Sequence, residues 1–119
     1  MLPFTHQYQL LGDTVVISLF GSLLNEQPKQ EVLDTVQSYL SIGKLMFIID
    51  CQALTAINSM GLTLLLNILT KVRNEDGEVV LVNIPTTLQK VLVITKLNSI
   101  FDIQATLEAA LEKYGMVKS

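Results

Sequence analysis

The chain carries a serine at the point where a helix is expected to begin, and this residue is its best candidate for chemistry. Ser59 follows Asn58 and precedes Met60 and Gly61, between an apolar segment at 45–50 and a leucine-rich segment. The free N–H groups and the dipole of a helix N-terminus favour an added negative charge, by roughly 0.3–1 kcal/mol at an exposed end. The Ser59 hydroxyl is therefore suited to a phosphorylation switch. The alternative is that Asn58 or Ser59 only caps the helix.

The other reactive side chains do not form a catalytic set. Asp50 ends the apolar segment, where a carboxylate could bind Mg²⁺ or accept a phosphoryl group, or could instead end the strand or bond to loop amides. His6 is the only histidine, and we expect it on the surface near the N-terminus, so a Ser-His relay with Ser59 is not expected. Cys51, the only cysteine, is expected to be a small buried residue and excludes an intramolecular disulfide. The sequence contains neither a GxGxxG nor a GxxxxGK[ST] motif. We predict no enzyme activity, no metal and no cofactor.

Composition favours one compact domain over residues 1–119. Half of the residues are hydrophobic, which is enough for a sizeable core. Only 16% are charged and the mean hydropathy is positive, which indicates a deeply buried sheet or an apolar surface kept for a partner. The net charge of −3 and the scattered basic residues argue against nucleic-acid binding. There is no apolar stretch of about 18 residues and no signal peptide, so we expect no membrane insertion and a cytoplasmic location.

The first half of the chain predicts a hairpin, a helix and a buried strand. Strands are expected at 8–11 and 14–20, joined by Gly12-Asp13 and ended by Gly21-Ser22. A helix capped by Asn25 and closed by Gly43 follows, with apolar residues at helical spacing. The segment 44–50 lacks alternation, which is typical of a central strand buried on both faces.

The second half alternates helices and strands. The expected elements are a helix at 59–73, a strand at 78–82, a helix opened by Pro85-Thr86, a strand near 101–103 and a helix at 106–114. Thr86 and Gln89 have the spacing of a capping box. This alternation after an opening hairpin predicts an α/β domain with a mixed sheet and a parallel section.

The element order and the serine before the second helix resemble the STAS domain of bacterial anti-sigma factor antagonists and sulfate-transporter tails. The most specific similarity is Phe47-Ile48-Ile49-Asp50 followed by residues 57–62. Residues 77–83, and 91–97 with Ile100-Phe101, are similar to later parts of the family pattern. The resemblance covers nearly the whole chain. It implies a mixed sheet of four to five strands, with about four helices packed mainly on one face.

The resemblance also implies a function. The family's phosphorylated serine corresponds to Ser59 in this sequence. An anti-sigma factor antagonist of this type binds an anti-sigma factor serine kinase when unphosphorylated, loses that partner when phosphorylated, and is reset by a serine phosphatase. The alternative is a non-switching STAS scaffold, or an accessory subunit of a membrane transport complex.

The sequence departs from the family pattern at three positions. Asn58 stands where the family usually has Asp, Met60 where it has Ser or Thr, and Lys96 where it has Gly. Asn58 can still cap the helix but lacks the negative charge. Met60 adds a flexible apolar side chain, a type that is common at adaptable binding surfaces.

A surface around the helix start is the expected partner contact. Met60, Leu64, Asn67 and Lys71 fall on one ridge of the helix by their spacing. Met60 and Leu64 could equally belong to the core. Contact with a second copy of the chain through the opening strands is left open. The predicted partner-binding residues are Asn58, Met60, Gly61, Thr63, Leu64 and Asn67.

Overall fold

The computed structural model describes residues 3–23 and 26–114, without the side chains of residues 23, 26–28, 59 and 60. The expected cap Asn25 lies outside the described residues. In chain order the elements are β1 (Thr5–Leu11), β2 (Thr14–Leu23), α1 (Glu26–Ser41), β3 (Met46–Ile57), α2 (Ser59–Arg73), β4 (Glu78–Val82), α3 (Thr86–Ile94), the short 3₁₀ helix η1 (Leu97–Ser99), β5 (Asp102–Gln104) and α4 (Leu107–Lys113).

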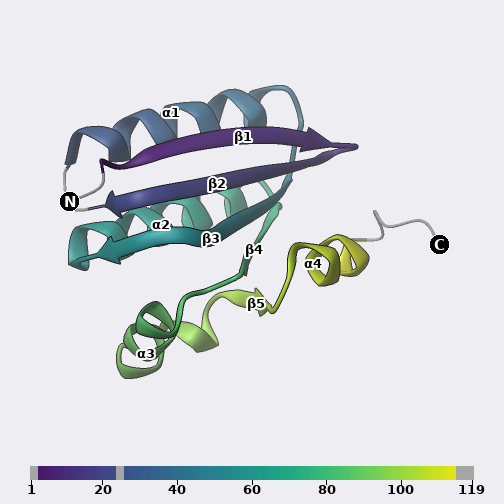
Figure 1. Cartoon of the computed structure of the whole chain (residues 1–119). Coiled ribbons are helices and arrows are strands. Elements are labelled where there is room, and N and C mark those ends of the chain that lie inside the picture. Colours follow the sequence, from purple (N-terminus) through teal and green to yellow (C-terminus); the bar gives the residue numbers. More distant parts are fainter. Residues whose placement is uncertain (1–2, 24–25, 115–119) are drawn as a thin grey trace.

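The strands form one mixed sheet in the order β1-β2-β3-β4-β5 (Figure 1). β1 and β2 are antiparallel, and Leu11 is the register partner of Thr14 at the hairpin. Gly12 opens this turn with a φ of 63°, a value that glycine adopts at no steric cost. The remaining neighbours are parallel. The predicted α/β class and mixed sheet are confirmed.

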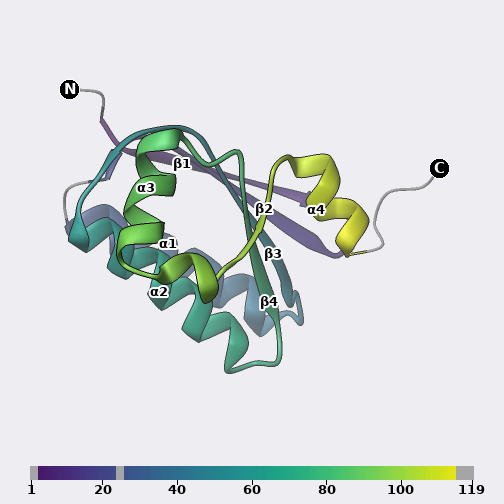
Figure 2. The same ribbon diagram turned by 90° about the horizontal axis from the view of Figure 1, so that it is seen from below.

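β3 is buried on both faces because helices cover the sheet from two sides. Ile49 packs into a large core with α1, α2 and α3, whereas Ile48 packs into a smaller core with α4. Both side chains are fully buried. Figure 2 shows α1, α2 and α3 on one side of the sheet and α4 on the other. The helices therefore lie mainly on one face, as predicted, and α4 is the exception.

Three strands are longer than the sequence pattern indicated: β1 begins at Thr5 instead of residue 8, and β2 and β3 both extend at their C-terminal ends. β2 continues to Leu23 instead of ending at Gly21, and β3 continues beyond Asp50 to Ile57. These extensions pair with each other, and their register shifts between Ser18 and Phe20 and again between Gly21 and Ser22. Such irregularities break the alternation of side chains along a strand. The pattern therefore understated both lengths, and the predicted ends at Asp50 and Gly21-Ser22 are wrong.

The helix starts follow local chemistry with one exception. α2 and β4 have the predicted bounds, 59–73 and 78–82. α4 begins one residue later than predicted, because Thr106 is its cap and accepts a hydrogen bond from the Ala109 N–H. The capping box at α3 is wrong, since the Gln89 amide donates to the Ile84 carbonyl, 2.9 Å away, and no side chain caps this helix. Of the helices that the structure describes, none combines the length and apolar character needed to cross a membrane.

A close approach at the turn before β4 yields the first testable prediction. A Cβ at Gly77 would overlap the Leu45 carbonyl oxygen and lie 2.7 Å from Val72 Cγ1. We expect Gly77→Ala to lower the free energy of unfolding by about 2–3 kcal/mol, because the backbone must move. Gly43→Ala is the control: Gly43 has nothing within 4 Å but a φ of +84°, so a loss of about 1 kcal/mol is expected. Urea denaturation of the two variants measures both values, and equal losses would contradict the prediction.

Candidate functional site

The candidate site lies where β3 extends past its neighbour β4. The two strands pair only from Met46 to Asp50, and the rest of β3 pairs with β2 as far as Ile57. Asn58 and α2 follow directly. The backbone of β2 therefore fixes the position from which α2 begins.

Asn58 is the N-cap of α2. Its backbone is extended (φ −114°, ψ −169°), and its Oδ1 accepts a hydrogen bond from the Gly61 N–H at 3.1 Å. Its carbonyl oxygen also accepts from the Leu62 N–H, at 3.0 Å. Ser59 is the first residue of the helix, and its side chain lies outside the described atoms, as does that of Met60. The sequence left open whether Asn58 or Ser59 caps the helix, and in the structure the cap is Asn58.

The other predicted contact residues of α2 are divided between core and surface. Thr63 is exposed and Asn67 is half-buried, whereas Gly61 is buried. Leu64 is fully buried in the large core, so its prediction as a partner-contact residue is wrong.

The ridge of α2 that contains Leu64 faces α1. At its far end the Lys71 ammonium donates to Gln37 Oε1 on α1, at 3.0 Å. α1 packs alongside α2 and buries residues that an isolated helix would expose. Helical spacing alone could not indicate on which side of α2 this neighbour would lie.

Asp50 stabilises the point where β3 and β4 separate. Its Oδ1 accepts hydrogen bonds from the Gln52 N–H at 3.0 Å and from Asn83 Nδ2 at 3.2 Å. Asn83 has a φ of 54°, a left-handed conformation that Asn tolerates better than most residues. The bond from the Gln52 amide agrees with the alternative that Asp50 bonds to nearby backbone amides instead of taking part in chemistry. No local pattern in the sequence indicated this role of Asn83, because it depends on a partner 33 positions away.

No metal-ligand cluster surrounds Asp50. Within residues 3–23 and 26–114, no group of three or more His, Cys, Asp or Glu side chains could hold a metal ion. A hollow of about 290 Å³ beside Asp50 is lined mainly by β2 and β3 residues, including Ser18, Phe20 and Gln52.

His6 is less exposed than the sequence indicated, with only 18% of its side chain accessible. Its Nδ1 lies 2.9 Å from the Tyr8 hydroxyl, and its Nε2 lies 3.2 Å from Glu31 Oε1 on α1. If the Tyr8 hydroxyl donates to Nδ1, then Nε2 carries the proton and donates to the Glu31 carboxylate. His6 is therefore at the surface but half-buried, because α1 packs across β1, and these contacts give it a role in joining the two elements.

The start of α3 lies next to the end of β3. Thr87 and Leu88 border a crevice of about 20 Å³ whose other side is formed by residues 54–57 of β3. Thr55 of this segment is bonded across to β2, with its Oγ1 3.2 Å from Ser22 Oγ. The segments that precede Ser59 and those that open α3 therefore form adjoining parts of one surface.

The comparisons with known proteins agree with this fold. The family model of the STAS domain matches residues 7–110. No curated protein sequence matches the chain at a significant level. The structural relatives include a candidate anti-sigma factor antagonist from Thermotoga maritima, with 24% identity, a TM-score of 0.81, and coverage of 91% of this chain and 92% of that one.

Two further structures are similar over almost their full length. The anti-sigma factor antagonist SpoIIAA in its unphosphorylated form is 22% identical, with a TM-score of 0.74 and coverage of 95% of this chain and 100% of that one. The Bacillus cell fate determinant SpoIIAA in its phosphorylated form is 24% identical, with a TM-score of 0.74 and coverage of 92% of this chain and 99% of that one. At these identities the similarity establishes the fold alone.

The cap of α2 can be tested by substitution. We expect Asn58→Ala to lower the free energy of unfolding by about 1 kcal/mol, because the Gly61 N–H loses its acceptor. Asn58→Asp should keep the cap and add about 0.3–1 kcal/mol through its charge at the helix N-terminus. Asn98→Ala, at an exposed asparagine in η1, is the control and should change the value by less than about 0.5 kcal/mol. Chemical denaturation distinguishes these outcomes, and an unchanged Asn58→Ala variant would contradict the capping role.

The thiol of Cys51 should be unreactive in the folded protein. Burial of the thiol, and to a smaller extent the negative charge of Asp50, raise the pKa of Cys51 to about 12. The thiol therefore stays neutral at pH 8 to 9. We expect iodoacetamide to label Cys51 only after denaturation, as measured by intact mass. Stoichiometric labelling of the native protein at pH 8 would contradict this.

Proposed function

This chain belongs to the STAS domain family, and we propose that it is an anti-sigma factor antagonist controlled by phosphorylation of Ser59. In this proposal the unphosphorylated protein binds an anti-sigma factor serine kinase in the cytoplasm. Phosphorylation releases the kinase, and a serine phosphatase restores binding. The observation that carries the proposal is the position of Ser59, the first residue of α2 and next to the cap Asn58.

The helix start is well suited to carry a phosphate without refolding. Phosphorylation adds about −1.5 to −2 charge at neutral pH. Asn58 Oδ1 already satisfies the Gly61 N–H, and the first amides of any helix lack intrahelical acceptors. These amides and the helix dipole stabilise negative charge at this position. Phosphorylation would instead destabilise the complex with the kinase, because a dry interface would have to remove water from a doubly charged phosphate.

The neutral cap affects the electrostatics of the switch. Asn58 accepts the hydrogen bond from Gly61 without contributing a negative charge beside Ser59. A carboxylate at this position would repel a phosphate on the next residue. Asn58 therefore supports a stable phosphorylated form, although a kinase that relies on that carboxylate would act more slowly.

The proposed contact surface consists of residues around the start of α2. The exposed side chains of Asn58 and Thr63 and the half-buried Asn67 border it, whereas Gly61 is buried and contributes only by its N–H bond to the Asn58 side chain. Met60 is included on the basis of its position in the sequence. This surface acts as a binding module and does not require a catalytic group.

Substitution of Ser59 tests this function. We expect Ser59→Ala to keep partner binding and abolish phosphate incorporation in the native cell, as measured by intact mass and phosphopeptide mapping. Ser59→Asp should lose the partner, because it places a permanent negative charge in the interface. Affinity co-purification of the wild type and Ser59→Asp provides that comparison. Ser41→Ala is the control, since Ser41 is exposed in the last turn of α1 and should not affect either readout.

Two outcomes would contradict the switch. Phosphate retained in Ser59→Ala would place the modification on another residue. Recovery of the same transport or scaffold proteins with the wild type and Ser59→Asp would favour the alternative, a non-switching scaffold or an accessory subunit of a membrane transport complex.

A further inference from the structure

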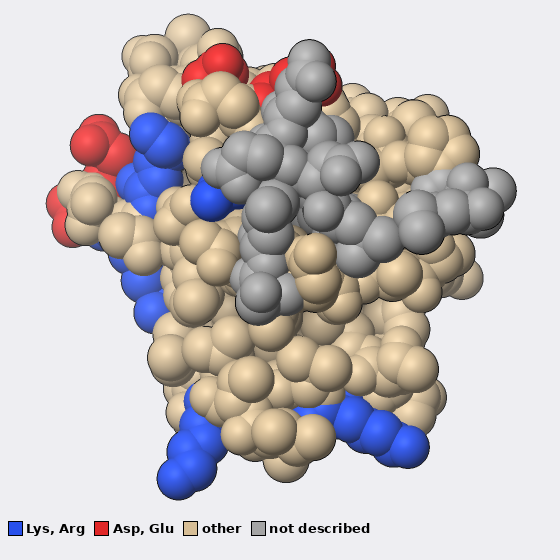
Figure 3. Space-filling view, turned by 90° about the vertical axis from the view of Figure 1, so that its left-hand side faces the viewer, with Lys and Arg blue, Asp and Glu red and all other residues tan. Residues whose placement is uncertain are grey.

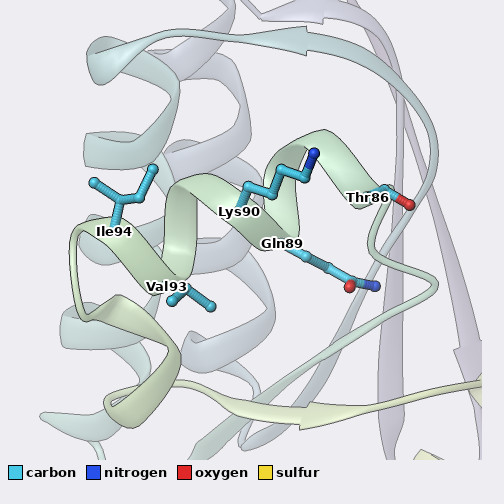
Figure 4. Close-up of a pocket in the computed structure, with 5 residues that line it drawn as sticks. All are labelled: Thr86, Gln89, Lys90, Val93 and Ile94. Carbon is cyan, nitrogen blue, oxygen red and sulfur yellow. The ribbon is translucent and has the colours of Figure 1, made fainter.

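Besides the side that packs on the large core, α3 has a stripe of residues at helical spacing that faces outward. Figure 4 shows its five members along the outer side of the helix, where they line a shallow hollow of about 420 Å³. The positions are spaced three and four residues apart, the pattern of one helix face. They are Thr86, Gln89, Lys90, Val93 and Ile94.

The last two turns of α3 are apolar on both sides. Leu88 and Leu92 are buried against the large core, whereas Val93 is 60% exposed and Ile94 is 79% exposed. Large aliphatic side chains at the C-terminal end of a helix are normally covered. The outer stripe of α3 therefore combines polar residues with two aliphatic side chains, Val93 and Ile94, that no element in the described part of this chain covers.

The apolar surface continues from α3 to the edge of the sheet. A second hollow, of about 200 Å³, shares Gln89 and Val93 with the first and reaches Ile103 of the edge strand β5. Ile103 is 38% exposed, and Ile100, just before β5, is 43% exposed. We call Lys90, Val93, Ile94, Lys96, Ile100 and Ile103 the α3 surface.

The charge of the α3 surface is opposite to that of the chain. Residues 84–101 contain Lys90 and Lys96 and no Asp or Glu, on a chain of net charge −3, and Asp102, which precedes Ile103, is paired with Lys113 at 2.6 Å. Both lysines are exposed. Figure 3 shows this end of the molecule, at the bottom of the view, as uncharged surface flanked by basic side chains, with the acidic ones at the opposite end. Lys96 lies just after α3 with a φ of 63°, a left-handed conformation that is unfavourable for a residue with a side chain.

We propose that the α3 surface binds an amphipathic helix of a partner protein that carries acidic residues beside its apolar face. Aliphatic side chains of the partner would cover Val93 and Ile94, and its carboxylates would pair with Lys90 and Lys96. Docking of an amphipathic helix on an apolar surface is a recurrent mode of peptide recognition. The flanking charges select an acidic partner and exclude a basic one.

The same charges disfavour two other occupants. A two-fold contact with a second copy would place the lysines of one α3 surface against those of the other. A membrane would be held by only two lysines and the exposed side chains of a nine-residue helix, which is little for stable attachment. The proposal goes beyond the role of Ser59 and does not depend on its phosphorylation.

The probe is a synthetic amphipathic peptide of about 18 residues, with leucines along one face and glutamates beside them. The control peptide has lysines in place of the glutamates. We expect saturable binding of the acidic peptide alone, measured by fluorescence anisotropy, and weaker binding when salt is raised from about 0.05 M to about 0.5 M. The double variant Val93→Ser, Ile94→Ser should weaken binding about tenfold, and Lys90→Gln about threefold.

Matched variants locate the binding. Ile42→Ser is the apolar control, because Ile42 is 67% exposed and lies in the α1–β3 connection. It should leave binding unchanged, as should Ser59→Asp. The peptide-binding result therefore does not depend on whether Ser59 is phosphorylated in the cell. Loss of the peptide in Ser59→Asp would instead place it at the start of α2 and overturn the assignment.

Five other results would overturn the proposal. Equal binding of the two peptides, or no binding of either, would exclude an acidic helix as the occupant. An equal loss in Ile42→Ser would show non-specific apolar adhesion. Tighter binding to phosphatidylserine vesicles, lost in the Val93 and Ile94 variant, would assign the surface to a membrane. A dimer in sedimentation velocity that the same variant abolishes would assign it to a second copy.

Discussion

The fold depends on the burial of β3 on both faces. Ile48 and Ile49 point to opposite sides of the sheet and are fully buried, so helices must cover each side. From Met46 to Asp50 the backbone of β3 is also paired along both edges, because an unpaired buried amide is costly. β2 and β4 provide that pairing, and α2 and α4 provide the cover from the two sides.

The candidate site follows from the unequal lengths of the strands that flank β3. β4 stops pairing at Val82, opposite Asp50, and β2 alone carries β3 on to Ile57. The Asp50 carboxylate accepts a hydrogen bond from a backbone amide of β3 and another from the Asn83 side chain, at the point where β4 leaves the sheet. This separation places the start of α2 and the start of α3 on adjoining parts of one surface.

The two proposed surfaces use different physical properties of that region. The start of α2 offers a helix N-terminus, where the dipole and the amides respond to a change of charge on Ser59. α3 offers an apolar surface, formed by the exposed Val93 and Ile94, that is flanked by the positive charges of lysines. The high hydropathy of the chain agrees with such a surface, because the exposed aliphatic residues add to a deeply buried sheet. A binding module can use both surfaces without moving its core.

Local features of the sequence determined the α/β class, the bounds of α2 and β4, and the ability of Asn58 to cap, because periodicity and capping act over a few neighbouring residues. Only the tertiary structure decided the length of β3, since that depends on the pairing of its end with β2. The burial of Leu64 and the half-buried position of His6 likewise depend on α1, which lies against both α2 and β1. Only the packing showed that Leu88 and Leu92 of α3 face the core whereas Val93 and Ile94 face outward, because all four are aliphatic and the sequence does not indicate which side of the helix its own chain will cover.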